Sequence, residues 1–557
     1  MKMMYKIYIK PKFIYFIAWV VAVGIFTSCQ KTNVGSTNGV YPDSTSRAAV
    51  KFLSAQVSPN NGLPGTVVTV LVSGLEGKMG TFKAYIGMTE AVVKSAGATS
   101  ITIAVPQNAS TGNVTILLNG QSFYGPKFTV SGKVYIDPDF NVNKNQATGT
   151  IYGIVPYGQS FIVYGNISKY AGSQFSGMTY IEANGDSSQG QPYFGPANTL
   201  KLSPGSILSM VGLPDGNFLM GGGFNSGFSS QNTPLDNLNG VARLFTNGSV
   251  DAIDTLGYQI PNVDAHNFPE RGWATGSAVN GGVEGGTVSK VFLTKDAQRY
   301  IVVGNFDRYV TTYYPGSQWN SFQQDKILMK QVLSMWTDGS FDSSFNYNYA
   351  TKSGYAATNA LVNDAVQGKD GNIVLVGTFT SYNGTPANRI VKIDAITGAI
   401  YPGFATGGGF DGIVTAIKYN ATWDRYIVTG LFKTYNGSPA NGVVMLKNDG
   451  TIDATFSARG FANGFPTFAR QLDNGLIICA GSFDSYDGVS RPGFSILNKD
   501  GSLAAGYNNT GNFSGTIYDA IETKSILTGQ PAVFLVGAFT RFDATSVSNI
   551  VKVVIER

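Results

Sequence analysis

One phrase recurs through the second half of the chain, and this repetition constrains the fold more than any other feature. Residues 373–393 read IVLVGTFTSYNGTPANRIVKI, and residues 427–447 read IVTGLFKTYNGSPANGVVMLK. Each copy runs from an apolar strand through a glycine and an aromatic residue to an Asn-Gly pair and a second apolar strand. Because Asn-Gly favours a tight hairpin turn, each copy predicts one unit of a β-sheet.

The pattern occurs seven times from about residue 160 onward, and its spacing indicates the architecture. The strand before the glycine is apolar on both faces, as in Ile373–Val376, so neighbouring units must cover it on both sides. Repeats of this length with several strands each are typical of a β-propeller. With Gly223 chosen over Gly222, the marker glycines are Gly165, Gly223, Gly304, Gly377, Gly430, Gly481 and Gly537.

We therefore predict an all-β chain in which residues 133–557 form a propeller of about seven blades, with six as the alternative. The repeats resemble the delta-60 repeat, a β-propeller repeat of bacterial secreted proteins. This resemblance implies the fold and says little about function. The segment IVKVVIE, residues 550–556, is expected to pair with a strand near Thr150.

A separate small domain is predicted over residues 49–132. Short alternating strands divided by turn residues, such as ITIAV at 101–105, favour a β-sandwich. The segments SPNNGLPGTVVTV (58–70), ITIAVPQNASTGNVTILLNGQS (101–122) and FTV (128–130) resemble the IPT/TIG domain, an immunoglobulin-like sandwich. The resemblance implies a spacer or a binding module, and the fold alone fixes no function.

Residues 1–28 are predicted to be an export signal. Lysines precede the fourteen apolar residues Phe13–Phe26, a run of signal-peptide length that is too short to span a bilayer. The run ends in FTSC, which resembles the bacterial lipobox and implies cleavage before Cys29 and lipidation of that cysteine. An ordinary secretory signal with a chance cysteine is the alternative. Residues 29–48 are polar and aperiodic, and we interpret them as a tether.

The order of lipobox, sandwich and repeats resembles an uncharacterised lipoprotein group of Bacteroidetes. The resemblance implies an outer-membrane lipoprotein, attached to the membrane through its N-terminal lipid and associated with polysaccharide uptake. The residues after Cys29 are QKTN, without the acidic residues associated with surface export. Both the cell surface and the periplasmic face therefore stay open.

Charge and residue counts exclude several classes of function. The formal net charge of +5 includes four leader lysines, so little net charge remains and no basic patch predicts nucleic-acid binding. One histidine, His266, and one further cysteine, Cys479, cannot build a usual zinc site, and we expect Cys479 to be buried. No serine lies in a nucleophile elbow. We predict no catalytic residue, no metal site and no cofactor.

Residues 137–145, DPDFNVNKN, are interpreted as the linker between the two domains. Their oxygen-bearing side chains alternate as in a calcium loop, but the central glycine and the distal glutamate of that loop are missing. A structural calcium ion is the alternative to a plain linker.

The candidate ligand-binding residues lie in an insertion after Gly304, NFDRYVTTYYPGSQWNSFQQDK. A loop that interrupts the repeat and concentrates aromatic residues is a typical place for a binding surface, and aromatic faces beside amides suit sugar rings. Packing of the rings against the propeller is the alternative. A second, weaker candidate is the insertion that begins at Asn225. The candidates in the first insertion are Tyr309, Tyr313, Tyr314, Trp319 and Phe322.

These observations favour a non-enzymatic, lipid-anchored envelope protein that binds carbohydrate. Two alternatives stay open. The first is a protein-interaction scaffold or adhesin of the outer membrane. The second is a propeller glycosidase or lyase, which requires a cluster of acids in the central channel.

Overall fold

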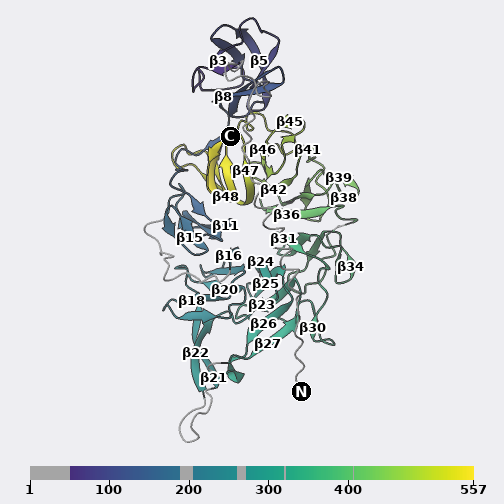
Figure 1. Cartoon of the computed structure of the whole chain (residues 1–557). Helices are drawn as coiled ribbons and strands as arrows, with labels where there is room; N and C mark the ends of the chain where they lie inside the picture. The colour runs from purple at the N-terminus through teal and green to yellow at the C-terminus, as the bar shows by residue number, and fades with distance from the viewer. Residues whose placement is uncertain (1–49, 188–204, 260–270, 319–320, 405–406) are drawn as a thin grey trace, which may run out of the picture. The chain divides into compact units, whose positions relative to one another are not determined.

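The computed structural model describes residues 50–187, 205–259, 271–318, 321–404 and 407–557 (Figure 1). The predicted leader and tether, Cys29, His266 and Trp319 lie outside these residues. In the described part of the chain, no helix has the length and apolarity needed to cross a bilayer. Apart from the short 3-10 helix η1 (Tyr314–Gly316), the regular structure there is β-strand, which confirms the all-β prediction.

Residues 51–130 form a sandwich whose two sheets share one strand, and its strand pairs are antiparallel except for β2 with β8. Strand β5 pairs with β4 through Thr89–Ala91 and with β6 from Val92 onward, so it passes from one sheet to the other. Burial alternates along the strands, as period-2 side chains require when one face is packed. The strands are β1 (Lys51–Phe52), β2 (Asn61–Gly62), β3 (Val67–Ser73), β4 (Phe82–Ile86), β5 (Thr89–Ala96), β6 (Ser100–Ala104), β7 (Gly112–Leu118) and β8 (Gln121–Val130).

Seven similar antiparallel sheets follow and form the blades of a propeller, so the propeller prediction is confirmed. The innermost strands succeed one another around the ring, where Figure 1 labels β11, β16, β24, β31, β36, β42 and β47. Blade 7 lies against blade 1, because β47 packs on β11. The innermost strands are β11 (Ile151–Tyr157), β16 (Ile207–Gly212), β24 (Thr287–Leu293), β31 (Val362–Gln367), β36 (Ile413–Asn420), β42 (Pro466–Gln471) and β47 (Ser514–Lys524).

Each innermost strand pairs with a second strand, and that strand pairs with a third. The second strands are β12 (Ser160–Gly165), β17 (Phe218–Gly222), β25 (Arg299–Asn305), β32 (Ile373–Gly377), β37 (Arg425–Leu431), β43 (Ile477–Gly481) and β48 (Pro531–Phe542). The third strands are β15 (Met178–Ile181), β20 (Val241–Leu244), β28 (Val332–Trp336), β35 (Ile390–Ile393), β40 (Val443–Lys447), β46 (Phe494–Leu497) and β50 (Ile550–Ile555).

Short outer strands extend the blades. They are β10 (Ala147–Thr148), β13 (Lys169–Tyr170), β14 (Ser173–Gln174), β18 (Ser226–Phe228), β19 (Pro234–Asp236), β23 (Gly282–Glu284), β26 (Arg308–Thr312), β27 (Gln324–Leu328), β29 (Tyr347–Asn348), β30 (Ser353–Gly354), β33 (Ser381–Tyr382), β34 (Thr385–Pro386), β38 (Thr434–Tyr435), β39 (Ser438–Pro439), β41 (Phe461–Ala462), β44 (Ser485–Tyr486), β45 (Val489–Ser490) and β49 (Thr545–Ser546). A longer hairpin, β21 (Ala252–Gln259) and β22 (Arg271–Ser277), follows blade 2.

The core lies between the blades, which explains why the repeated strand is apolar on both faces. Ile373 and Leu375 of β32 join a cluster with residues of blade 3, whereas Val374 and Val376 join a cluster with residues of blade 5. All four side chains are fully buried. Because successive side chains of a strand point to opposite faces, a single blade cannot bury its own sheet.

Every innermost strand carries a β-bulge near its start, where one residue has no partner on the second strand. A bulge of this kind bends the strand and redirects the side chain of the extra residue. We call these the bulge residues: Tyr152, Leu208, Ser289, Asn363, Thr415, Thr467 and Tyr518.

The marker glycine of each repeat lies opposite the bulge, and no side chain fits there. A Cβ atom placed on Gly377 would lie 2.1 Å from the carbonyl oxygen of Leu361, and the equivalent distance in the other blades is 2.0 to 2.3 Å. The equivalent glycine of blade 2 is Gly222, which pairs with Ile207, so the choice of Gly223 from the sequence was wrong. The glycine is therefore required by the close approach of two backbones.

The ring is closed by strands from both ends of the propeller, in a way that differs from the prediction. Strand β50 pairs with β48 and, on its other side, with β9 (Val134–Ile136). The expected pairing with a strand near Thr150 was therefore wrong, although the Asn549 side chain donates to the carbonyl of Gly149 at 2.8 Å. The segment after β9 is also no simple linker, because Asp137 is fully buried against Lys552.

Five blades share a buried tyrosine that ties the outer hairpin to the blade. In each, the hydroxyl group donates to the carbonyl oxygen of a glycine in the turn beyond the third strand. These glycines all have positive φ, which other residues adopt only with strain. The pairs are Tyr170–Gly185, Tyr309–Gly339, Tyr382–Gly398, Tyr435–Gly450 and Tyr486–Gly501.

Tyr435→Phe is expected to lower the free energy of unfolding by about 1–2 kcal/mol, because the buried Gly450 carbonyl loses its 2.8 Å hydrogen bond. Denaturant unfolding measures the change. Tyr313→Phe is the matched control, since that side chain is exposed and should leave stability unaltered. Equal effects of the two substitutions would show that the Tyr435 hydrogen bond adds nothing.

Candidate functional site

The central channel of the propeller holds a cavity to which every blade contributes. Its volume is about 320 Å³, and its lining includes all seven bulge residues. This volume lies at the lower end of the range of roughly 300–1,000 Å³ that is usual for small-molecule sites. The bulges therefore place seven side chains, one from each blade, around a space suited to one small ligand.

Hydroxyl and amide groups dominate this ring of bulge residues. The hydroxyl groups of Ser289 and Thr415 donate to the carbonyls of Val303 and Thr429 on their own second strands, at 3.2 and 3.1 Å. The Asn363 amide donates to the carbonyl of Val414 in the next blade at 2.7 Å. These bonds fix the side chains and leave their oxygen atoms able to accept hydrogen bonds from a ligand.

Two tyrosines meet at the junction of the first and last blades. The rings of Tyr152 and Tyr518 lie 5.2 Å apart between centroids, at an interplanar angle of 55°. Tyr518 is 39% exposed, and burial raises the pKa of its hydroxyl above the usual value. Within the described part of the chain, neither hydroxyl group makes a hydrogen bond to another protein group, so both remain available to a ligand. Together the two rings offer an apolar face with polar edges.

A charged cluster lies beside the ring. Lys290 and Lys418 both reach the carboxylate of Asp364, at 3.3 and 3.7 Å. Burial alone would raise the pKa of Asp364, but the two lysines and two backbone N–H groups hold it below the ordinary value. Burial lowers the pKa of Lys418, and Asp364 only partly offsets this effect. The pKa of Lys290 is instead raised, because the nearby carboxylates outweigh its burial.

In three blades the residue after the bulge contacts the next blade. Ser209, Asp364 and Asp519 accept hydrogen bonds from the backbone N–H groups of Val291, Ile417 and Ile154, respectively, at 3.1 to 3.4 Å. Asp519 also pairs with Arg470 at 3.4 Å. These contacts bind neighbouring innermost strands together and fix the wall of the channel.

The acidic groups in and beside the channel are ion-paired. A glycosidase general acid must stay protonated near neutral pH, which requires a raised pKa. The pKa of Asp364 is instead lowered, and both Asp364 and Asp519 are paired with cations. The described lining of the cavity thus combines hydroxyl and amide groups with an ion-paired carboxylate.

The structure separates the aromatic residues predicted as ligand contacts. Tyr309 is the buried structural tyrosine of blade 3, only 1% exposed, and this burial removes it from the candidate surface. Tyr313 and Phe322 are exposed, while Tyr314 is half-buried and its ring lies 5.7 Å from that of Phe322. These three residues form a small aromatic patch beside η1, and Trp319 lies outside the described residues.

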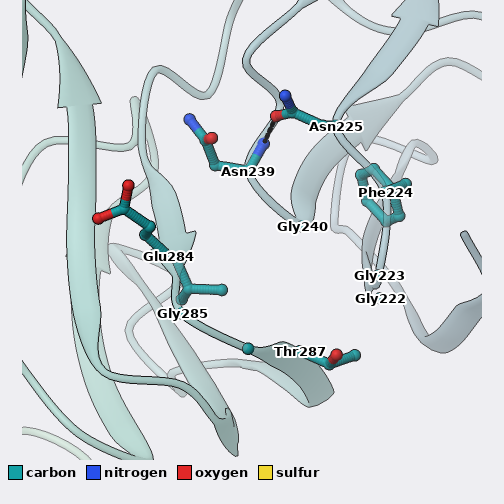
Figure 2. Close-up of a pocket in the computed structure, with 11 residues that line it drawn as sticks. Gly222, Gly223, Phe224, Asn225, Asn239, Gly240, Glu284, Gly285 and Thr287 are labelled. Atoms are coloured by element: carbon teal, nitrogen blue, oxygen red, sulfur yellow. Dashed lines mark hydrogen bonds between the residues drawn. The ribbon is translucent and has the colours of Figure 1, made fainter. Parts of the chain in front are cut away.

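A second cavity, of about 350 Å³, lies between blades 2 and 3 (Figure 2). One wall belongs to the insertion that begins at Asn225, whose side chain accepts a hydrogen bond from the Asn239 backbone at 3.0 Å. The other wall includes Glu284, whose carboxylate bonds Lys326 at 2.5 Å. Phe224 is buried, so this glycine-rich cavity offers no exposed aromatic face among its lining residues.

Two family models match parts of the chain. The model described as "Domain of unknown function (DUF5122) beta-propeller" matches residues 368–404 and 424–456, within blades 4 and 5. The model described as "Domain of unknown function (DUF5008)" matches residues 25–126, which include most of the sandwich. Each match covers less than half of the chain. No curated protein matches it.

The solved structures that match most of this chain have low sequence identity and low TM-scores. A structural genomics protein of unknown function from Bacteroides thetaiotaomicron is 10% identical with a TM-score of 0.28, and covers 91% of this chain and 98% of its own. An auxiliary nutrient binding protein from Bacteroides ovatus is 12% identical with a TM-score of 0.27, covering 90% and 97%. The Dos1 propeller is 8% identical with a TM-score of 0.33, covering 76% and 94%. At such scores these similarities carry no argument about function.

Proposed function

We propose that this protein is a non-enzymatic binding protein of the bacterial envelope, and that it binds a small saccharide in the central channel. The observation that carries the proposal is the ring of bulge residues around the 320 Å³ cavity. Tyr152 and Tyr518 supply an aromatic face for the C–H side of a sugar ring. Hydroxyl and amide oxygens opposite them accept hydrogen bonds from sugar hydroxyl groups.

The aromatic patch of Tyr313, Tyr314 and Phe322 supports a second, outer contact for a longer glycan. This patch is smaller than predicted, because Tyr309 is buried. It would serve a chain that extends beyond the channel. The proposal includes neither a cofactor nor a nucleic-acid partner. We propose binding without catalysis because Asp364 in the cavity wall and the nearby Asp519 are ion-paired.

Attachment to the outer membrane through a lipid on Cys29 is part of the same proposal and rests on the lipobox-like FTSC. Several acyl chains on one residue would anchor the protein stably, whereas a single chain binds weakly. Labelling cells with a fatty-acid analogue tests it. Label in the wild-type protein and none in Cys29→Ser supports lipidation, and equal labelling of both contradicts it.

Tyr518→Ala is expected to weaken saccharide binding about tenfold, the loss of roughly 1.4 kcal/mol of stacking and hydrogen bonding. The chain from Gln30 onward, which keeps every described residue, is screened on a glycan array. Hits are then measured by titration calorimetry with the wild-type protein, Tyr518→Ala and Tyr152→Ala.

Two controls locate the site. Tyr124→Ala removes a tyrosine on the sandwich that is 74% exposed, and it should leave affinity unchanged. Tyr313→Ala tests the outer patch. Binding that is lost in Tyr313→Ala and retained in Tyr518→Ala would move the primary site out of the channel, and a blank array would overturn the saccharide proposal.

A further inference from the structure

We propose that the saccharide bound in the channel is acidic and carries a single carboxylate, as hexuronic acids do. This inference rests on the proposed function and names the class of its ligand. It comes from the charges of the cavity wall, in which two lysines and one aspartate face the same space.

The cavity wall has a surplus of one positive charge. Lys290 and Lys418 line the cavity together with Asp364, which is the only acidic residue among its described lining. The nearby Arg470 and Asp519 pair with each other at 3.4 Å, so they add no net charge. Because opposite charges attract strongly away from bulk water, a monoanion in the cavity would neutralise the surplus.

Asp364 cannot supply that neutralisation by itself, because its carboxylate is already fully used. One oxygen accepts from the backbone N–H of Ala365 at 3.0 Å and lies 3.3 Å from Lys290. The other accepts from the N–H of Ile417 at 3.1 Å and lies 3.7 Å from Lys418. An ammonium group carries three N–H donors, so Lys418 holds donors that this distant contact does not satisfy.

The Lys418 side chain is only 17% exposed, and it lines the cavity, so its free donors face the space that a ligand would occupy. A charged group that is buried with an incomplete counter-ion is costly, and the lowered pKa of Lys418 reflects that cost. A ligand carboxylate between Lys290 and Lys418 would complete the pairing. The hydroxyl groups of Thr415 and Ser289 are on the same innermost strands as these lysines and suit the sugar hydroxyls.

The test compares glucuronic acid with glucose, which differ at C6 by a carboxylate in place of a hydroxymethyl group. Calorimetry on the chain from Gln30 should show glucuronic acid at least tenfold tighter. Lys418→Met should abolish this preference. Lys433→Met, an exposed lysine of the same blade, is the matched control and should preserve the preference.

Asp364→Asn tests whether the charged cluster recognises the ligand carboxylate or only holds the cavity wall together. It removes the competing carboxylate, so glucuronic acid should bind more tightly, whereas loss of wall structure would weaken both sugars. Thermal unfolding checks that each variant is folded. Equal affinities for the two sugars, dependent on Tyr518 and insensitive to Lys418→Met, would overturn this inference and leave the proposed function intact. If the protein binds neither these two sugars nor any other saccharide, the proposed function is overturned.

Discussion

Lys552→Met is expected to lower the free energy of unfolding by about 3–5 kcal/mol, the usual cost of leaving buried charges without their partner. The Lys552 side chain is fully buried, and its ammonium group lies 3.0 Å from Asp137 and 3.1 Å from Asp139. Methionine fills a similar volume but leaves two carboxylates facing each other without a cation. Denaturant unfolding of the variant measures the effect.

The triple variant with Asp137→Asn, Asp139→Asn and Lys552→Met tests the cause. Because it removes the charges together, it should recover part of the stability that Lys552→Met loses. Lys83→Met is the matched surface control, since the Lys83–Glu90 pair is more than half exposed and should matter little. If Lys552→Met is no more harmful than Lys83→Met, the buried cluster does not hold the ring closed.

Gly377→Ala is expected to cost about 3 kcal/mol of stability, from overpacking of two backbones in the core. The added Cβ would lie 2.1 Å from the Leu361 carbonyl oxygen, a distance that no rotamer change can relieve. The innermost strand of blade 4 must therefore move away or lose its bulge. Denaturant unfolding gives the loss of stability.

Gly212→Ala is the matched control for this effect. Gly212 also lies in a blade strand, has no positive φ, and has no atom within 4 Å of an added Cβ. Alanine there should be neutral or slightly stabilising, because it restricts the unfolded chain. Similar losses from both substitutions would mean that the contact with the carbonyl oxygen is not what requires glycine.

The repeat could be predicted because packing between blades imposes it on the sequence. Ile373–Val376 must be apolar at four consecutive positions, and Gly377 must lack a side chain. The same sequence pattern therefore recurs in each blade. The closing strand β9 could not be predicted. It consists of three residues, Val134–Ile136, and nothing in so short a segment distinguishes it from other apolar stretches.

Tyr309 shows how an available signal was missed. In the aligned repeats it stands where Tyr382, Tyr435 and Tyr486 stand, and all four donate to a glycine carbonyl. The repeat therefore already assigned it a structural role, although the surrounding aromatic residues suggested a ligand surface. Tyr313 and Phe322 have no such counterpart in the short repeats, and they are the exposed members of the set.

The channel residues left a weaker trace in the sequence. Each bulge residue follows an apolar or proline residue at the start of an innermost strand, as in Val362-Asn363-Asp364 and Val414-Thr415-Ala416. The second position carries a different type of side chain from blade to blade, so self-alignment of the chain gives it no weight, although all seven of these residues line the cavity.

This variation separates the stability of the bulge from the chemistry of its side chain, two demands that most binding sites must satisfy together. The opposing glycine and the apolar neighbours keep each bulge in place, whatever side chain the bulge residue carries. Tyr152, Leu208 and Thr467 occupy equivalent positions with three different chemistries. The ring thus offers seven positions at which the side chain can be exchanged. A change of preferred ligand needs only single-residue substitutions at these positions, and the scaffold stays the same.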